Sequence, residues 1–202
     1  MADFKLARAS PEDMLEIVRL QFRAFPGPIH QDIFLGPNTP EGHEHLARSY
    51  VRTMQTNSGD YWMKVTEKAT GKIVAATEWR IHPTVLPDHA AEEDMSLSWL
   101  QDKPERLAFA RDILGQSLAA RRKHFTEPYI LGTMMIDWGC PLADQLFLPI
   151  WISASSDGRK LYQTCGFHDV EDFVQVVFMK RDPKIGGMEV YGQNAGAEPL
   201  KV

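Results

Sequence analysis

The segment 143–167 (ADQLFLPIWISASSDGRKLYQTCGF) has the most informative spacing of reactive side chains in this sequence. Its pattern predicts a helix, a strand over 149–155, a Ser-Asp-Gly turn, and a short helix that carries Tyr162 and that Gly166 ends. A phenol with a pKa of about 10 can hand a proton to a thiolate as negative charge develops on the sulfur. The alternative for Tyr162 is a ring packed in the core with its hydroxyl at the surface.

The histidines and cysteines do not fall at metal-ligand spacing. His43 and His45 form a His-x-His pair in a predicted helix, so their side chains point to different sides. No cysteine or acidic cluster joins them, and we predict no metal site. Cys165 has no base near it in sequence and is interpreted as a small apolar residue. The sequence also lacks a glycine-rich nucleotide loop of the Rossmann or Walker type.

The segment 143–167 resembles the C-terminal half of the GNAT N-acetyltransferase superfamily, particularly its small fungal members. The family pattern is roughly Ala-Asp-x-x-x-Leu-Pro, a strand ending in Ala-Ser, and Gly-x-x-Leu-Tyr-x-x-x-Gly-Phe, and all three parts stand here in order. A looser resemblance covers 3–181. It implies an α/β (α+β) acyl-CoA N-acyltransferase fold, in which a mixed central sheet is flanked by helices. Acetyl-CoA enters between two parting strands of such a sheet, and its pantetheine arm pairs like an extra strand.

The resemblance also implies roles for individual residues. Tyr162 matches the tyrosine that in many members protonates the departing CoA thiolate. The residues that match the strand end beside the pantetheine and the turn after it are Ser153, Ala154, Ser155 and Gly158. Glu78, in the predicted strand ATEWRIH, matches the acidic group on a central strand that often accepts the ammonium proton of the acceptor. An amine of this kind has a pKa of about 10.4 and must lose that proton before it attacks. A solvent-facing strand glutamate is the alternative for Glu78.

The second signature of the family, Gln/Arg-x-x-Gly-x-Gly/Ala, is absent. In the family its backbone N–H groups hold the CoA diphosphate at the start of a helix. Here Tyr-Ile-Leu (129–131) runs straight into Gly132 and Thr133, which look like the last glycine of that loop and the opening of its helix. The resemblance therefore implies that most of the central strand and nearly all of the phosphate loop are truncated between Leu131 and Gly132.

Two explanations of this truncation remain open: loss of a segment from an ordinary acetyltransferase, or a natural divergent member. A three-residue strand spans only about 10 Å, so its neighbours lose backbone partners in either case. Thr133 can still cap the helix and leave its first N–H groups free for an anion. We expect that the affinity for acetyl-CoA is severely weakened.

Sequence patterns predict the elements that position these residues. The N-terminal half reads as a strand over 3–8, a helix that Ser10 caps, a surface loop over 26–42, a helix over 43–54 and a hairpin of 61–67 with 72–82. An irregular insertion or lid over 83–103 precedes a helix whose start is marked by a capping-box pattern of Asp102 and Glu105. Pro141 predicts a kink or break at 138–141, and 170–180 reads as one strand, apolar on both faces.

Composition limits the class of protein. The 202 residues carry a net charge of −5, which argues against nucleic acid as a partner, and no apolar run approaches the roughly 20 residues that span a bilayer. Two cysteines are too few for a disulfide framework, so a cytoplasmic location is expected. We predict one acetyltransferase-like domain over 1–182 and a disordered tail over 183–202.

The function implied is acetyl transfer from acetyl-CoA to an amine acceptor, either a small molecule or a peptide. The alternatives are a catalytically inactive domain of the same fold that serves as a binding or regulatory module, and a non-functional product that folds poorly. The sequence does not identify the acceptor.

Overall fold

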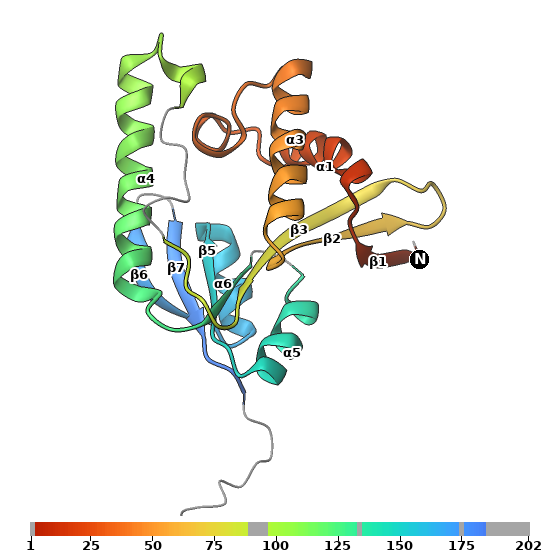
Figure 1. Ribbon diagram of the computed structural model, residues 1–202, viewed down its shortest axis with the longest axis vertical. Helices are drawn as coiled ribbons and strands as arrows, with labels where there is room; N and C mark the ends of the chain where they lie inside the picture. The colour runs from red at the N-terminus through yellow and green to blue at the C-terminus, as the bar shows by residue number, and fades with distance from the viewer. Residues whose placement is uncertain (1–2, 89–96, 133–134, 174–175, 185–202) are drawn as a thin grey trace, which may run out of the picture.

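One seven-stranded mixed sheet organises the structure, a computed structural model that describes residues 3–88, 97–132, 135–173 and 176–184 (Figure 1). The strand order is β1-β2-β3-β4-β5-β7-β6. The strands are β1 (Phe4–Arg8), β2 (Asp60–Glu67), β3 (Ile73–His82), β4 (Tyr129–Gly132), β5 (Ile150–Ala154), β6 (His168–Phe173) and β7 (Val176–Arg181). Only β4 and β5 pair in parallel; the other pairs are antiparallel. The predicted α/β class and the predicted hairpin of β2 with β3 are confirmed.

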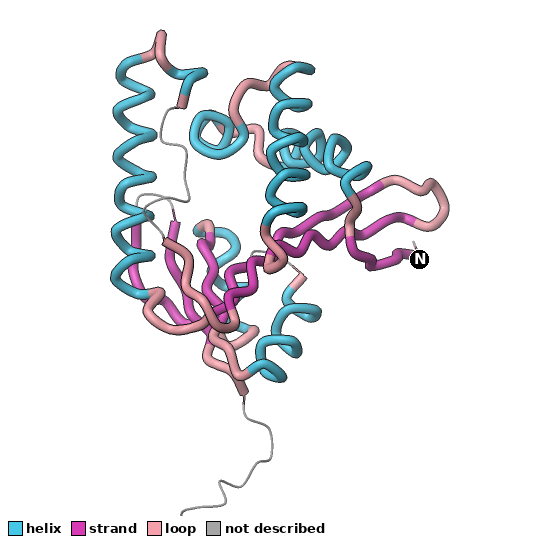
Figure 2. The backbone as a smooth tube through the Cα atoms, in the orientation of Figure 1, coloured by secondary structure: helices cyan, strands magenta, loops and turns pink. Residues whose placement is uncertain are grey.

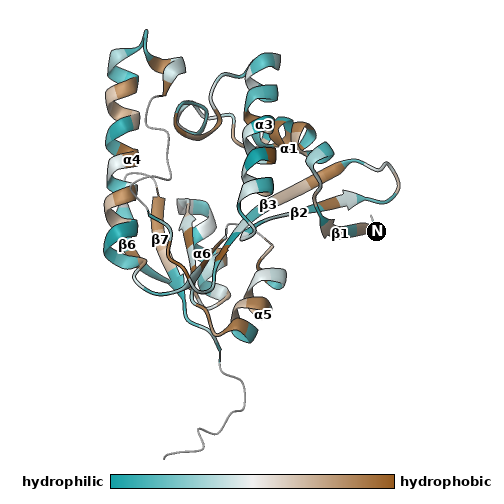
Figure 3. Cartoon of the chain, in the orientation of Figure 1, coloured by the Kyte–Doolittle hydropathy of each residue, from teal (hydrophilic) through white to brown (hydrophobic). Residues whose placement is uncertain are grey.

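Helices cover both faces of this sheet (Figure 2). They are η1 (Pro11–Asp13), α1 (Met14–Ala24), α2 (Pro28–His30), η2 (Gln31–Leu35), α3 (Pro40–Thr56), η3 (Ser98–Leu100), α4 (Pro104–His124), α5 (Ile136–Leu146) and α6 (Ser156–Thr164). The face that carries Trp62 and Trp151 packs against α1, α3 and α4. The opposite face, with Met63 and Ile150, packs against α5 and α6. Figure 3 shows apolar and polar residues interspersed along α4, whose buried residues are Ala110, Leu114, Leu118 and Ala120.

Ser10 starts the first helical segment, as the sequence predicts. Its N–H donates to Oδ2 of Asp13 at 2.7 Å, and its hydroxyl reaches the same oxygen at 3.0 Å. The carboxylate of Asp13 also holds the Lys64 ammonium of β2 at 2.5 Å. This contact connects the start of the first helix to the second strand, because Lys64 lies on the sheet face that α1 covers.

Strand β4 is short, so its described residues pair with only part of each neighbouring strand. It pairs with β3 only through residues 79–82, and with β5 only at Ile150 and Trp151. Among the described residues, 75–78 of β3 therefore pair with β2 alone, and 152–154 of β5 pair with β7 alone. The two edges face each other across the position that a longer β4 would occupy.

Trp79 packs the side of β4 against α5. Its side chain is 1% exposed, and its ring meets that of Trp138 edge-on, with centroids 5.6 Å apart. A Cβ added at Gly132 would lie 2.1 Å from the indole, and one at Gly139 would lie 2.0 Å from it. Both positions therefore need glycine so that strand and helix can close on the ring.

Helix α5 differs from the sequence-based expectation. The sequence predicts a kink or break at 138–141, and a break is wrong, because the helix runs from Ile136 to Leu146 through Pro141. Pro141 cannot bond the carbonyl of Asp137, but both residues are exposed and water can satisfy that oxygen. The helix begins at Ile136 rather than at Thr133, which lies outside the described residues.

The stretch 26–42 is not the surface loop that its prolines and glycines predict. It holds α2, η2 and the start of α3, and it buries Ile33 and Leu35. Pro28 and Pro40 stand at the first positions of helices, where proline costs no hydrogen bond. The insertion 83–103 contains η3, which packs with Ile33 against α4; residues 89–96 lie outside the described ranges.

The predicted single strand over 170–180 is also wrong, because this region belongs to the hairpin of β6 and β7. Edge strand β6 carries Asp169, Glu171 and Asp172, whereas β7 buries Val177, Phe178 and Met179 between β5 and β6. The connection at Val174 and Gln175 lies outside the described residues. It has none of the glycine, proline, asparagine or aspartate that marks a turn in sequence. The predicted tail falls almost wholly beyond residue 184, where the described residues end.

A buried ion pair fastens the end of β7 to α5. Arg181 is 3% exposed and donates through both terminal nitrogens to the two oxygens of Asp144, each at 2.8 Å. The backbone N–H of Lys184 donates to the same carboxylate at 2.7 Å. The hydrogen bonds from Arg181 hold the pKa of Asp144 below its ordinary value.

Replacement Asp144→Asn is expected to lower the free energy of unfolding by about 3 kcal/mol, because it leaves a buried guanidinium without its counter-charge. In the wild type this contribution is present above the ordinary aspartate pKa and is lost as the pH falls below it. Urea unfolding at pH 7 and pH 3 measures both effects. Asp169→Asn, at a more exposed ion pair, is the control and should cost about 1 kcal/mol or less. Equal losses in the two variants would contradict the assignment.

Candidate active site

The end of β5 and the start of α6 bring three of the candidate residues together. Ser155 begins α6, and its hydroxyl accepts the N–H of Gly158 at 3.2 Å. A Cβ added at Gly158 would lie 3.1 Å from Cε2 of Tyr162, so the glycine leaves room for the ring. Ala154 precedes them and is 1% exposed, whereas Ser153 points from the opposite face of β5 and is exposed.

Tyr162 is partly buried beside this strand end. Its ring meets Phe167 edge-on, with centroids 5.7 Å apart, and packs on the core cluster that α5 and α6 cover. Burial, and to a smaller extent the nearby Cys165, raises the pKa of the Tyr162 phenol. The group therefore keeps its proton throughout the neutral range, which is the state that a proton donor requires.

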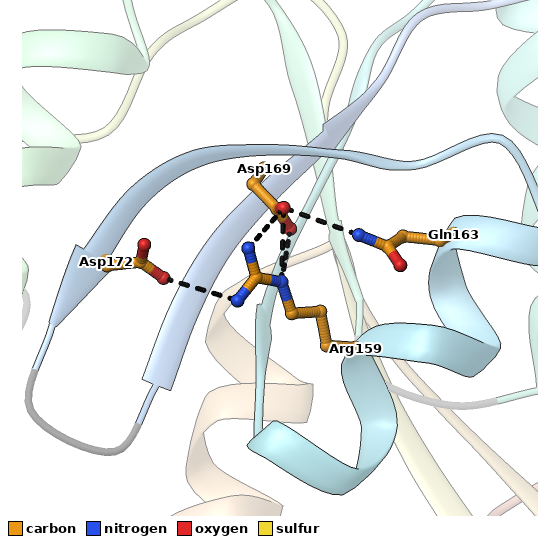
Figure 4. Close-up of polar contacts among 4 residues, drawn as sticks. All are labelled: Arg159, Gln163, Asp169 and Asp172. Carbon is orange, nitrogen blue, oxygen red and sulfur yellow. Dashed lines mark hydrogen bonds and ion pairs between the residues drawn. The ribbon is translucent and has the colours of Figure 1, made fainter.

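A polar network fixes α6 against β6 (Figure 4). The guanidinium of Arg159 contacts both oxygens of Asp169, with Nη2 at 2.6 Å and Nε at 3.1 Å. Asp172 lies 3.9 Å from the same guanidinium, and the amide of Gln163 donates to Asp169 at 3.3 Å. Because Arg159 and Tyr162 stand three residues apart on one short helix, this network limits how that helix rotates over the sheet.

Glu78 lies on the other face of the sheet, under α1 and α3. It pairs with Trp62 across the hairpin, and its side chain is 26% exposed. The Nε of Arg80, two residues along the same strand, donates to its Oε1 at 2.8 Å. Glu78 belongs to the part of β3 that no β4 residue covers. Tyr162 and Glu78 are thus on opposite faces of the sheet.

Asp60, the first residue of β2, was not a candidate from the sequence. It is 1% exposed, and neither of its carboxylate oxygens has a hydrogen-bond partner among the described residues. Burial and the neighbouring Glu78 raise the pKa of Asp60 to about 7. The signal that could have found it is the hairpin register, which places Asp60 opposite Arg80 on the face that carries Glu78.

Gly132 occupies a strand position rather than a phosphate loop. It pairs with Trp79 in the β3–β4 ladder, and its missing side chain makes room for that indole. Thr133 lies outside the described residues. Residues 133–135 connect β4 to α5, and Met135, which immediately precedes the helix, has a left-handed conformation with φ at 58°. This connection is shorter than the Gln/Arg-x-x-Gly-x-Gly/Ala segment that the family resemblance would place there.

The described residues contain no group of three or more His, Cys, Asp or Glu side chains placed to hold a metal ion. They contain no helix with the length and apolar character that a membrane span requires.

Comparison with solved structures identifies the fold. The C-terminal condensation domain of Ebony, in complex with β-alanyl-dopamine, superposes with a TM-score of 0.60 at 10% identity, over 90% of this chain and 100% of that chain. Mosquito arylalkylamine N-acetyltransferase like 5b superposes with a TM-score of 0.56 at 12% identity, over 88% of this chain and 98% of that chain. The structure described as histone acetyltransferase HPA2 and related acetyltransferase from Corynebacterium glutamicum superposes with a TM-score of 0.55 at 12% identity, over 91% of this chain and 98% of that chain. The sequence matches no family model, and the search of curated proteins finds no relative. The chain has the GNAT acyl-CoA N-acyltransferase fold, as its sequence predicts.

Proposed function

We propose that this chain transfers an acetyl group from acetyl-CoA to an amine, with Tyr162 as general acid and Glu78 as general base. The observation that carries the proposal is the position of Tyr162, which lies on the helix that follows β5 in a GNAT fold. Beside it, the edge of β5 at 152–154 lacks a strand partner among the described residues.

The chemistry of the site supports this assignment. The donor arm pairs with the backbone of β5, beside Ser153, Ala154, Ser155 and Gly158. The amine nitrogen attacks the thioester carbonyl, so that a C–N bond forms and the C–S bond breaks. Tyr162 gives its proton to the departing sulfur, and Glu78 takes the proton that the ammonium must lose. Acetylated amine and free CoA are the products, and no covalent enzyme intermediate forms.

We propose a small-molecule amine as the acceptor and the cytoplasm as the location. Two of the similar structures support the acceptor class by their descriptions: one is an arylalkylamine N-acetyltransferase, and the other was solved with β-alanyl-dopamine. Two free cysteines suit a reducing compartment. A peptide amine is the competing acceptor, and a panel of arylalkylamines and lysine peptides distinguishes the two.

Tyr162→Phe is expected to lower kcat by about a hundred-fold, because it removes only the proton donor and keeps the ring. Mass spectrometry of the acetylated amine, at millimolar acetyl-CoA, measures the rate. The matched control is Tyr61→Phe on β2, whose ring lies under Arg8 with the guanidinium 4.6 Å from the centroid. This control should keep kcat within about two-fold. Unchanged kcat in Tyr162→Phe would remove the phenol from the mechanism.

A binding or regulatory module without catalytic activity is the second candidate, and the connection of three residues between β4 and α5 favours it. The same assay separates the two. If the wild-type chain forms no acetylated product from any amine at millimolar donor, whereas a variant with the missing loop inserted does, the chain as it stands is the inactive form. If neither forms product, the acetyl-transfer proposal is wrong.

A further inference from the structure

Two carboxyl groups from adjacent strands lie together on the sheet face under α1 and α3. Asp60 pairs with Arg80 in the β2–β3 ladder, and Trp62 pairs with Glu78, so Asp60 and Glu78 are diagonal neighbours. Diagonal Cα atoms in an antiparallel pair are roughly 7–8 Å apart, and long side chains reach across this distance. Glu78 accepts the Nε–H of Arg80, whereas both oxygens of Asp60 lack hydrogen-bond partners among the described residues.

The surroundings of the pair combine neutral aromatic groups with one adjacent cation, Arg80, which lies opposite Asp60 in the ladder and donates to Glu78. From α3, Tyr50 lies over Trp62 with ring centroids 4.8 Å apart, and its hydroxyl donates to Gln21 of α1 at 3.3 Å. Burial, and then the charge of Glu78, raises the pKa of Tyr50, so it remains a neutral neighbour. The other titratable groups on this face are Arg80 and His82 of β3, Lys64 of β2, Asp13 of η1 and Glu16 of α1, whose carboxylate accepts the Ile73 N–H.

We propose that Asp60 is a positioning residue for Glu78, and that the two carboxyls share one proton at neutral pH. The catalytic role of Glu78 in this proposal rests on the proposed function. The sharing of a proton by Asp60 and Glu78 rests only on their positions in the β2–β3 ladder and on the burial of Asp60. Two carboxyls at diagonal positions of a ladder do not both ionise freely when one is 1% exposed and its oxygens have no hydrogen-bond partner among the described residues, even with the Arg80 cation on the same face. The protons of such a pair belong to the pair rather than to either residue.

Sharing a proton makes the carboxyl pair a stronger proton acceptor at neutral pH than an ordinary glutamate. A solvated glutamate releases its proton at a pH of about 4.3 and is a weak acceptor for an ammonium proton. A pair that loses its last proton near neutral pH, as burial of Asp60 beside Glu78 favours, holds an incoming proton better. In the transfer reaction, the ammonium proton of the acceptor moves to the doubly ionised pair, the free amine attacks, and the pair returns the proton to water.

Carboxyl carbon NMR titration tests the sharing without any activity. The wild-type chain should show one carboxyl step near pH 7, Asp60→Asn should abolish this step, and Glu78→Gln should move its midpoint to lower pH by about one unit. Asp169→Asn, at the ion pair of α6 with β6, is the control and should leave the step in place. A step that persists in Asp60→Asn, or keeps its midpoint in Glu78→Gln, would overturn the proposal.

Two further measurements complete the test. The free energy of unfolding of the wild type should fall between pH 5 and pH 8, because the folded chain holds a proton that an unfolded aspartate has already released. This measurement needs no variant, and a rise over that range would count against sharing. In acetyl transfer, kcat should rise through pH 7 in the wild type and be flat from pH 6 to pH 8 in Asp60→Asn. A chain that shows the NMR steps but acetylates no amine would reject the proposed function and keep the pair.

Discussion

Acetyl-CoA and S-acetyl-pantetheine are expected to bind this chain with nearly equal affinity, within about three-fold. The two donors differ by the diphosphate and the nucleotide, and a connection of three residues between β4 and α5 offers little to hold them. Each hydrogen bond to a charged phosphate oxygen is worth about 1.5–3 kcal/mol, so losing two of them costs roughly a hundred-fold to ten-thousand-fold in affinity. Calorimetric titration of the same protein with both ligands measures this directly.

The control is a variant with a Gln-x-x-Gly-x-Gly segment inserted between Leu131 and Gly132. This variant should prefer acetyl-CoA to S-acetyl-pantetheine by at least a hundred-fold. A similar preference in the chain as it stands, with micromolar acetyl-CoA binding, would mean that an intact anion site exists elsewhere and that the truncation has no effect on donor binding.

Gly139→Ala is expected to lower the free energy of unfolding by about 3 kcal/mol or more, although alanine is the better helix former. The new methyl group would lie 2.0 Å from the indole of Trp79, and this ring has little room to retreat because Gly132 of β4 also lies against it: a Cβ added there would be 2.1 Å from the same indole. Overpacking of a filled core costs about 1–3 kcal/mol and more where the neighbours cannot move. Chemical denaturation measures the change.

Gly115→Ala in α4 is the matched control. No atom lies within 4 Å of the position of its added Cβ, so helix propensity alone acts and stability should rise by about 0.5–1 kcal/mol. If the free energy of unfolding falls in Gly139→Ala and rises in Gly115→Ala, the contact with Trp79 is the cause of the loss at Gly139. A stabilising Gly139→Ala would show that β4, Trp79 and α5 do not pack as described.

Local signals predicted many of the elements. The hairpin of β2 and β3 follows from β-forming runs around a Thr-Gly turn, and the helix that bears Tyr162 follows from its helix-ending Gly166, whose φ is 89°. These predictions succeeded because the residues that decide each element lie within a few positions of it. The connection of β6 to β7 had no turn residue, and only the charge of Asp169 and Glu171 distinguishes the edge strand from its buried neighbour.

The site was harder to predict because its members meet through pairing. Asp60 is one acidic residue among many until the register of β2 with β3 places it beside Glu78. Gly132 matched a loop glycine by sequence, yet its neighbour in space is Trp79, 53 positions earlier in the chain. The roles of Tyr162 and Glu78 came from a family resemblance and remain predictions until the variants above are measured.

The shortness of β4 has a consequence for how stability is distributed. On the face under α1, α3 and α4, the core that contains Trp62 is separate from the core that contains Trp151. On the opposite face a single core joins Met63 and Trp79 to β5 and β7, and four residues of β4 link the two ladders. Backbone hydrogen bonds next to a strand that ends early open at low free energy, so we expect the two ladders to open separately beside β4 before the shared core unfolds. Melting curves from Trp62 and Trp151, one in each ladder, need not coincide, and a single melting temperature then describes neither ladder.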